Sequence, residues 1–128
     1  RDVGPAECAA VVKADAYGLG AAAVAPALAD AGCRTFFVAT LAEGVALRAA
    51  LPAARIFIFE GPARSDTAPF FTHRLGPVLN SLDQIDIWRE AVRQTHGQPP
   101  PWALHIDTGM ARLGLTADAV AILAVMVI

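Results

Sequence analysis

TFFVATLAEGVALRAALPAARIFIFEGP, residues 35–62, places two apolar runs on either side of a segment with helical composition. The flanking runs, Thr35–Thr40 and Arg55–Glu60, are continuously apolar between their end residues, as in strands that are covered on both faces. Leu41–Leu51 is rich in alanine and leucine and stops at Pro52, which cannot continue a helix. This order predicts a βαβ unit, since parallel strands need a crossover connection.

The same alternation continues in both directions from this unit. Further strands are predicted at Ala9–Lys13, Leu75–Asn80 and Trp102–Asp107, and further helices in the alanine-rich segment that ends at Asp30, at Ser65–His73, at Ser81–Thr95 and from Thr116 onward. Ser81 and Gln84 are predicted to form a capping box. Five strand-then-helix units predict an α/β fold with a parallel sheet, either doubly wound or part of a TIM (β/α)8 barrel. A complete barrel takes roughly 250 residues, so this chain would supply about five of its eight units.

Composition excludes several classes of protein. Hydrophobic residues make up 55% of the 128 residues and charged residues 17%, which excludes intrinsic disorder. The formal net charge of -2 indicates no basic patch for nucleic acid, and no apolar run reaches the roughly 18 to 20 residues of a membrane span. We therefore expect a single domain without a nucleic-acid or membrane partner.

The cysteines and the ends of the chain lead to three further expectations. Cys8 and Cys33 lack the spacing of a metal site or a disulfide framework, so we expect reduced thiols in the core. Reduced cysteines and the lack of an apolar leader in residues 1–4 favour the cytoplasm. Neither end has the features of a natural terminus, and we expect a truncated or processed chain.

The segment AVVKADAYGLG, residues 10–20, contains Lys13, the only lysine of the chain, at the end of a predicted strand. Working residues lie at the carboxyl ends of strands in both candidate architectures. A partly desolvated lysine is the nucleophile for a Schiff base, and Tyr17 offers a phenol as donor. The glycines beside a helix start favour a phosphate. The alternative is that Lys13 extends to solvent while Tyr17 only packs, and the residues by themselves leave both open.

The segment HIDTGMARLGL, residues 105–115, follows the fifth predicted strand. His105 and Asp107 face the same side of that strand, but the other two histidines lack ligand spacing, so no metal site is predicted. Arg112 could bind a phenolate or a carboxylate with two hydrogen bonds, or it could form a local ion pair with Asp107. Met110 is either a packing residue or a ligand contact.

Both segments closely resemble the signature sequences of the alanine racemase family, with Lys13 and Arg112 separated by 99 positions. The resemblance runs from about Glu7 to about Thr116, which is less than half of a typical member. It implies that residues 1–128 are a partial N-terminal barrel domain that binds pyridoxal phosphate (PLP), and that the family's C-terminal β domain is absent from this chain. It also implies a homodimer with shared active sites, alanine as substrate, and D-alanine supply for peptidoglycan precursors.

The resemblance implies specific roles for five residues of this sequence. Lys13 corresponds to the lysine that forms the internal aldimine with PLP and serves as one of two acid/base groups. Tyr17 corresponds to the tyrosine that contacts the cofactor phosphate. Arg112 corresponds to the arginine that binds the cofactor's phenolic oxygen close to the substrate carboxylate. Met110 is implied at the substrate, and Asp107 in a supporting role.

This sequence departs from the family pattern at three points. His105 stands where some members have a carbamylated lysine, so support for Arg112 must come from another group. Leu19 replaces the usual histidine of the first segment. The family's second base is a tyrosine of the partner's C-terminal domain, whereas this chain contains only Tyr17. The expected activity is therefore two-base racemisation of alanine by the parent protein. Alternatives are an inactive fragment, a cofactor-binding protein without racemase activity, or a racemase for serine, lysine or several amino acids.

Overall fold

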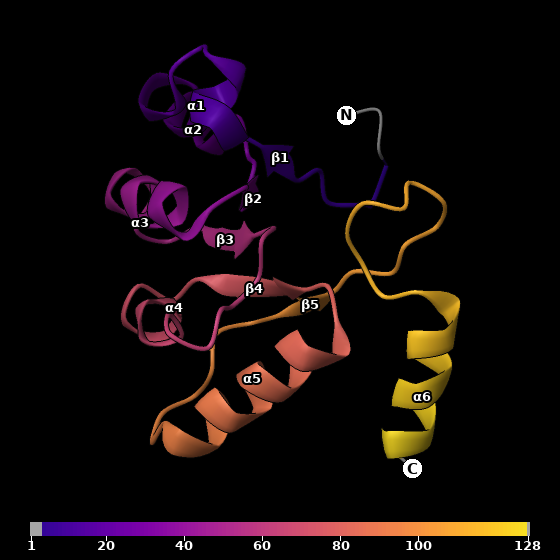
Figure 1. Ribbon diagram of the computed structural model, residues 1–128. Coiled ribbons are helices and arrows are strands. Elements are labelled where there is room, and N and C mark those ends of the chain that lie inside the picture. Colours follow the sequence, from indigo (N-terminus) through magenta and orange to yellow (C-terminus); the bar gives the residue numbers. More distant parts are fainter. Residues whose placement is uncertain (1–3, 128) are drawn as a thin grey trace.

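The computed structural model describes residues 4–127 as five strands and six helices (Figure 1). The strands are β1 (Ala10–Val11), β2 (Thr35–Val38), β3 (Arg55–Ile58), β4 (Gly76–Leu79) and β5 (Ala103–Leu104). The helices are α1 (Lys13–Tyr17), α2 (Ala21–Asp30), α3 (Leu41–Ala50), α4 (Ala68–Thr72), α5 (Leu82–Gln94) and α6 (Ala117–Val127). Within this described part, no helix combines the length and the apolar character that crossing a membrane requires.

All strands are parallel, and their order in the sheet is their order in the chain, β1-β2-β3-β4-β5. Phe36 in β2 lies opposite Ala10 on one side and Ile56 on the other. A doubly wound sheet reverses its strand order at a switch point, whereas the wall of a (β/α)8 barrel does not. The strand order therefore excludes the doubly wound sheet, and the chain forms five βα units of the wall of a (β/α)8 barrel.

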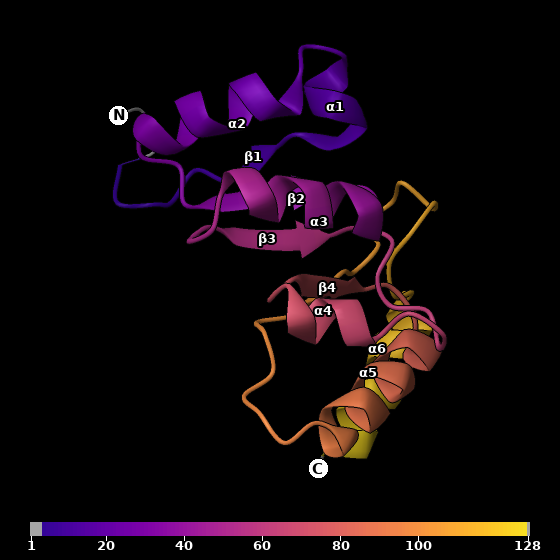
Figure 2. The same cartoon turned by 90° about the vertical axis from the view of Figure 1, so that its left-hand side faces the viewer.

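The core lies between the sheet and the helices on its outer face, as Figure 2 shows for α3 beside β2 and β3. Alternate strand residues point to this face, and Phe36, Val38, Ile56 and Ile58 are almost completely buried there. Helix α3 approaches the sheet at Gly44, where an added Cβ would collide with the side chain of Ile58. The absence of a side chain at this position therefore sets how closely α3 packs.

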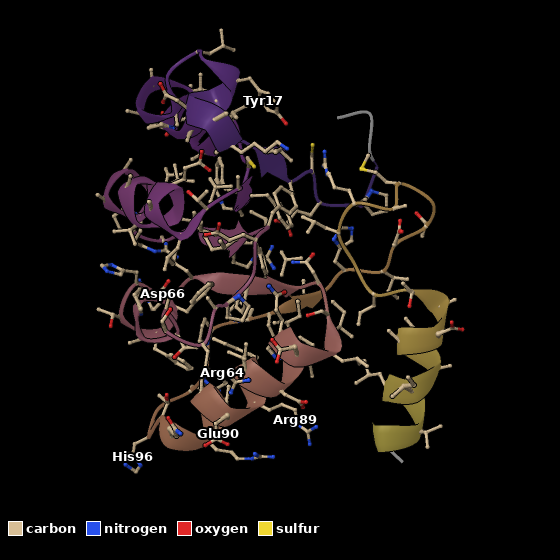
Figure 3. All side chains as sticks on the ribbon, in the orientation of Figure 1. Tyr17, Arg64, Asp66, Arg89, Glu90 and His96 are labelled. Atoms are coloured by element: carbon tan, nitrogen blue, oxygen red, sulfur yellow. The ribbon has the colours of Figure 1, made fainter. Side chains whose placement is uncertain are left out.

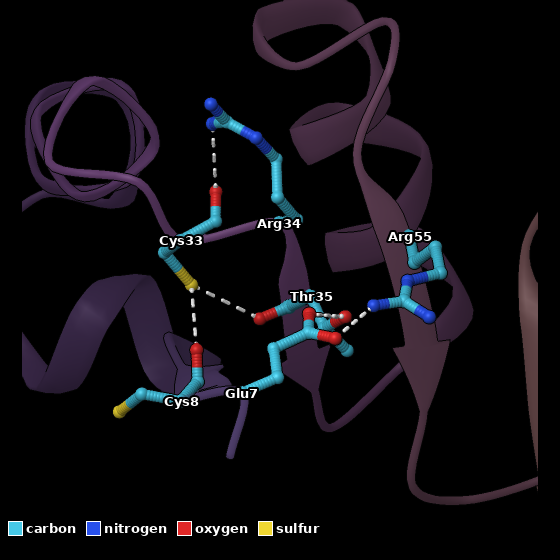
Figure 4. Close-up of polar contacts among 6 residues, drawn as sticks. All are labelled: Glu7, Cys8, Cys33, Arg34, Thr35 and Arg55. Atoms are coloured by element: carbon cyan, nitrogen blue, oxygen red, sulfur yellow. Dashed lines mark hydrogen bonds and ion pairs between the residues drawn. The ribbon is translucent and has the colours of Figure 1, made fainter. Parts of the chain in front are cut away.

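At the amino ends of the strands, the segment before β1 is tied to β2 and β3 through Glu7 (Figure 4). The Glu7 carboxylate accepts a hydrogen bond from Thr35 Oγ1 at 2.6 Å and forms an ion pair with the Arg55 guanidinium. The Arg55 hydrogen bond, and then that of Thr35, lowers the pKa of the Glu7 carboxyl from its usual range. Cys33 Sγ donates to the carbonyl oxygen of Thr35 at 3.2 Å.

The structure corrects two expectations from the sequence, the capping box at Ser81 and the burial of Cys8. The Ser81 cap is present, because Ser81 Oγ accepts from the Gln84 N–H, but the reciprocal half of the predicted capping box is wrong. The Gln84 side chain instead accepts from the Asn80 N–H at 2.8 Å and donates to the Glu60 carbonyl at 2.7 Å. Both cysteines are free, yet Cys8 is exposed and lies outside the core.

Candidate active site

Both singled-out segments lie at the carboxyl edge of the sheet. Lys13 is separated from the end of β1 by Val12 alone, and the loop of residues 105–115 follows β5. Because the strands are parallel, their carboxyl ends meet at one edge, where the ends of β3 and β4 also contribute Phe59 and Asn80. Figure 3 shows the Tyr17 side chain pointing away from α2, toward the face of the sheet that the outer helices leave free.

Lys13 is half-buried, and its Nζ atom lies 5.9 Å from the centroid of the Phe59 ring. This is within the range of a cation–π contact. Phe59 belongs to a row of rings on the inner face of the sheet, in which Phe37 stacks on Phe57 at 5.1 Å and on Phe59 at 5.2 Å between ring centroids. We call Phe37, Phe57 and Phe59 the aromatic row. Sequence reasoning missed it, although Phe57 and Phe59 are spaced two apart in a strand pattern.

The chain leaves Lys13 in a left-handed helical turn rather than as the predicted end of a strand. Residues 14–17 all have φ between 51° and 56°. This conformation costs roughly 1–2 kcal/mol for each residue with a side chain. The Gly18 N–H donates to the Ala14 carbonyl at 3.0 Å, and the Gly20 N–H donates to the Asp15 carbonyl at 2.9 Å. Hydrogen bonds thus offset the backbone strain directly after the lysine.

Two carboxylates accept hydrogen bonds from backbone N–H groups at the start of this turn and shortly after it. Asp15 Oδ1 accepts from the N–H of Ala21, the first residue of α2, at 2.7 Å. Glu43 Oε1 accepts from the Ala14 N–H at 2.8 Å. Glu43 was not singled out from the sequence, although the threonine three positions before it is the sequence signal of a capping box.

Asp107 organises the loop that carries Arg112. Its Oδ1 accepts from the Gly109 N–H at 2.9 Å, and both of its carboxylate oxygens lie 3.0 Å from the Ala111 nitrogen. Hydrogen bonding by the Ala111 N–H, followed by that of Gly109, lowers the pKa of the Asp107 carboxyl. Among the ion pairs within residues 4–127, none joins Asp107 to Arg112, so that alternative is wrong. Arg112 is exposed, and Met110 is 75% exposed, which argues against a packing role.

Asn80 orients the ring of His105. Asn80 Nδ2 donates to the carbonyl oxygens of Phe59 at 2.8 Å and Val78 at 3.0 Å, so its Oδ1 is left as an acceptor. His105 Nδ1 lies 2.8 Å from that oxygen and therefore carries a proton. The neutral ring keeps an unprotonated Nε2. Within the described part of the chain, no group of three or more His, Cys, Asp or Glu side chains is arranged to hold a metal ion.

The structure connects some of the predicted residues and leaves others apart. Lys13 contacts Phe59, whose carbonyl oxygen binds Asn80, which in turn holds His105. These contacts connect the end of β1 to the end of β5 along one edge of the sheet. Tyr17 is the last residue of α1, and Met110 and Arg112 lie on the loop of residues 105–115; within residues 4–127 their side chains make no hydrogen bond to Lys13. A lysine amine beside an aromatic ring, with an exposed phenol and an exposed guanidinium on neighbouring segments, offers groups that suit an anionic, aromatic ligand.

Comparison with known proteins gives a consistent result. The family model for the alanine racemase N-terminal domain matches residues 1–127. The alanine racemase of Acidiphilium cryptum is 55% identical over 115 residues, covering 90% of this chain and 32% of that protein. The alanine racemase of Rhodospirillum rubrum is 54% identical over 112 residues, covering 87% of this chain and 30% of that protein. The chain thus spans about a third of the length of the curated relatives it matches.

Solved structures agree with the sequence relatives. The alanine racemase of Bartonella henselae, with covalently bound pyridoxal phosphate, superposes with a TM-score of 0.86 at 41% identity, covering 94% of this chain and 34% of that one. The biosynthetic alanine racemase of Pseudomonas aeruginosa gives a TM-score of 0.83 at 35% identity, covering 98% of this chain and 34% of that one.

Proposed function

We propose that this chain, which belongs to the alanine racemase family through its N-terminal domain, is the cofactor-binding part of an enzyme that interconverts L-alanine and D-alanine. The observation that carries the proposal is the position of Lys13. This sole lysine lies half-buried at the carboxyl end of β1, with its ammonium group against Phe59. The same edge of the sheet carries the 105–115 loop with Arg112.

The residues at this edge fit pyridoxal phosphate, the cofactor bound covalently in the Bartonella henselae relative. Lys13 offers the amine for covalent attachment, and the aromatic row offers an apolar wall beside it. Tyr17 is 64% exposed, which leaves its phenol free to donate to a phosphate. A Cβ added at Gly18 or Gly20 would meet nothing within 4 Å, so the backbone there is open to an anion.

The chain's own residues then take distinct roles. When bound, pyridoxal phosphate supplies an electron sink for the charge left at the substrate's α-carbon. Lys13 holds the cofactor and moves a proton on one face of that carbon. We assign Arg112 to the cofactor's phenolic oxygen, close to the substrate carboxylate, and Met110 to the substrate. Asp107 fixes the loop that carries both through its bonds to backbone N–H groups.

Racemisation needs a second proton-transfer group on the opposite face. The substrate's α-proton leaves from one side and a proton returns from the other, so a base held on one face does not serve both. The only tyrosine of this chain is Tyr17, which the proposal already uses at the phosphate. We therefore infer that a tyrosine outside these 128 residues supplies the second base, in a homodimer with shared active sites. Cytoplasmic location and D-alanine supply for peptidoglycan precursors belong to the same proposal.

The 128-residue chain on its own has a different expected activity from that of the parent enzyme. It spans about a third of the curated relatives and has no spare tyrosine, which favours a fragment without racemase activity when it is alone. A parent racemase acting on serine, lysine or several amino acids is the remaining alternative.

The test is cofactor trapping at Lys13. The full-length protein is incubated with pyridoxal phosphate, reduced with borohydride, digested and analysed by mass spectrometry, and racemisation of alanine, serine and lysine is measured in parallel. We expect label on Lys13 and racemisation of alanine. The variant Lys13→Arg keeps the cation but not the nucleophilic amine, and should lose both signals. Label elsewhere, or turnover of another amino acid but not of alanine, would overturn the assignment.

A further inference from the structure

Glu43 connects two segments of backbone, one directly after the cofactor lysine and one at the end of β2. Its Oε1 atom accepts from the Ala14 N–H at 2.8 Å, while its Oε2 atom accepts from the N–H groups of Ala39 at 2.8 Å and Thr40 at 3.3 Å. Ala14 is the residue directly after Lys13, Ala39 follows β2, and Thr40 is the cap of α3. One half-buried carboxylate therefore joins the start of the left-handed turn to the end of the neighbouring strand.

The Ala14 N–H depends on this carboxylate for its hydrogen bond. Farther along the turn, the Ala16 N–H donates to the Val12 carbonyl at 3.0 Å, so residues inside the turn support each other. The bond from Ala14 to Glu43 instead reaches across to another βα unit, 29 residues later in the chain. It fixes the direction in which the backbone leaves Lys13.

Packing gives the turn little support on this side. A cavity of about 310 Å³ lies between the turn, α2 and α3, and its lining includes both Asp15 and Glu43. Small side chains such as Ala22 and Ala46 form part of its wall and do not fill it. Because few side chains pack against the turn here, its strained backbone depends more on hydrogen bonds to carboxylates for its stability.

We propose that Glu43 is a positioning residue for Lys13, which acts through the Ala14 N–H to hold the lysine amine in place against Phe59. This assignment rests on the proposed function, because it concerns the amine to which the cofactor attaches. A carboxylate is required at this position, since one acceptor oxygen faces the Ala14 N–H and the other faces the N–H groups of Ala39 and Thr40. The amide of Glu43→Gln has one oxygen, and its NH2 group would face either the Ala14 N–H or the Ala39 N–H.

Glu60 provides a matched control at the same helix terminus. Its Oε1 atom accepts from the N–H of Leu41, the first residue of α3, at 2.7 Å. Glu60 is exposed, and its side chain makes no hydrogen bond to residues 13–20. Glu43→Gln and Glu60→Gln each remove one carboxylate from the amino terminus of α3, but only Glu43→Gln disturbs the turn after Lys13.

The experiment compares wild type, Glu43→Gln and Glu60→Gln in the full-length protein. The readouts are the rate of borohydride-trapped pyridoxal phosphate on Lys13, amide hydrogen exchange of residues 13–20, and the thermal midpoint. We expect both variants to lower the midpoint by a few degrees through weakened capping. Only Glu43→Gln should slow labelling of Lys13, by about tenfold or more, the change expected for one lost hydrogen bond to a charged group. It should also speed exchange in the turn.

Two results would overturn the assignment. One is wild-type labelling and exchange in Glu43→Gln despite a lower midpoint, which would make Glu43 a helix cap only. The other is equal slowing in Glu60→Gln, which would mean general destabilisation. Absence of label on wild-type Lys13 would instead count against the proposed function, and the hydrogen-exchange comparison would still decide the role of Glu43.

Discussion

His105 Nδ1 lies 2.8 Å from Asn80 Oδ1, and the direction of this hydrogen bond follows from the other contacts of Asn80. Because the Asn80 amide nitrogen already donates to the carbonyls of Phe59 and Val78, the oxygen must accept. The neutral imidazole is thereby held in one tautomer at the carboxyl edge of the sheet, and its Nε2 atom has no hydrogen-bond partner among residues 4–127. A histidine in this position can accept a proton or a hydrogen bond without reorienting.

The first prediction concerns this tautomer. In wild type, the neutral His105 ring should carry its proton on Nδ1, which nitrogen-15 chemical shifts measure directly. Asn80→Ala removes the acceptor and leaves two carbonyl groups short of a donor, so the ring should sample both tautomers. The unfolding free energy should fall by about 1–3 kcal/mol. A proton found on Nε2 in wild type would contradict the assignment.

Asp107→Asn should loosen the loop that carries Arg112. Asp107 Oδ1 accepts from both the Gly109 and the Ala111 N–H, and an amide oxygen can keep these two bonds, but the amide NH2 group would replace Oδ2 and face the Ala111 N–H, and the negative charge would be lost. We expect kcat/KM for alanine to fall by roughly tenfold, because small displacements of positioning groups carry such penalties. Asp118→Asn, in the first turn of α6, is the control and should leave kcat/KM unchanged. Equal values for both variants would show that Asp107 does not position Arg112.

Gly76→Ala should destabilise the protein. A Cβ at this position would collide with the Pro101 carbonyl oxygen and lie 2.7 Å from the Phe57 ring. Overpacking of this kind costs about 1–3 kcal/mol, measured by urea unfolding with tryptophan fluorescence. Gly97→Ala adds the same methyl group where nothing lies within 4 Å, and should change the unfolding free energy by less than about 0.5 kcal/mol. An unchanged unfolding free energy in Gly76→Ala would mean that β4 and the segment that contains Pro101 can move apart to accommodate the added methyl group.

Glu7 should make stability depend on pH in the acid range. Its pKa is lowered in the folded state, chiefly by the Arg55 hydrogen bond, so the unfolded chain binds the proton more readily. The stabilisation is present above the unfolded pKa near 4.5 and is lost as the pH falls through the lower folded value. Glu7→Gln should flatten this part of the profile of urea midpoint against pH.

The control for that profile is Glu90→Gln. Glu90 pairs with Arg93 on the exposed side of α5, where ion pairs contribute little. This variant should keep the wild-type slope between about pH 6 and pH 3. A wild-type slope in Glu7→Gln would show that other carboxyl groups control acid stability.

The sequence predicted the elements of the fold better than their order in space. Thr35–Val38 and Leu41–Ala50 form as expected, because a continuous apolar run and an alanine-rich segment each have few alternatives. Hydropathy contains no information on strand order, so the residues alone left two architectures open. The resemblance to a known family favoured the barrel, and the sequential strand order now confirms it.

The site was less predictable than the fold. Lys13 lies at the carboxyl edge of the sheet as expected, but the left-handed turn after it had no signal, since residues 14–17 contain no glycine. The positions of Glu43 and Asn80 depend on contacts between different βα units. Local sequence patterns cannot report such contacts, because the partners lie 29 and 25 residues apart.

The bond between Ala14 and Glu43 also sets an order of events during synthesis. When residues 10–20 first leave the ribosome, Glu43, whose carboxylate binds the Ala14 N–H, is still inside the exit tunnel. The turn can reach its final form only after the second βα unit has emerged and α3 has packed on the sheet. A nascent chain halted before α3 has left the ribosome would therefore hold Lys13 without its final geometry, and the site forms together with the barrel wall.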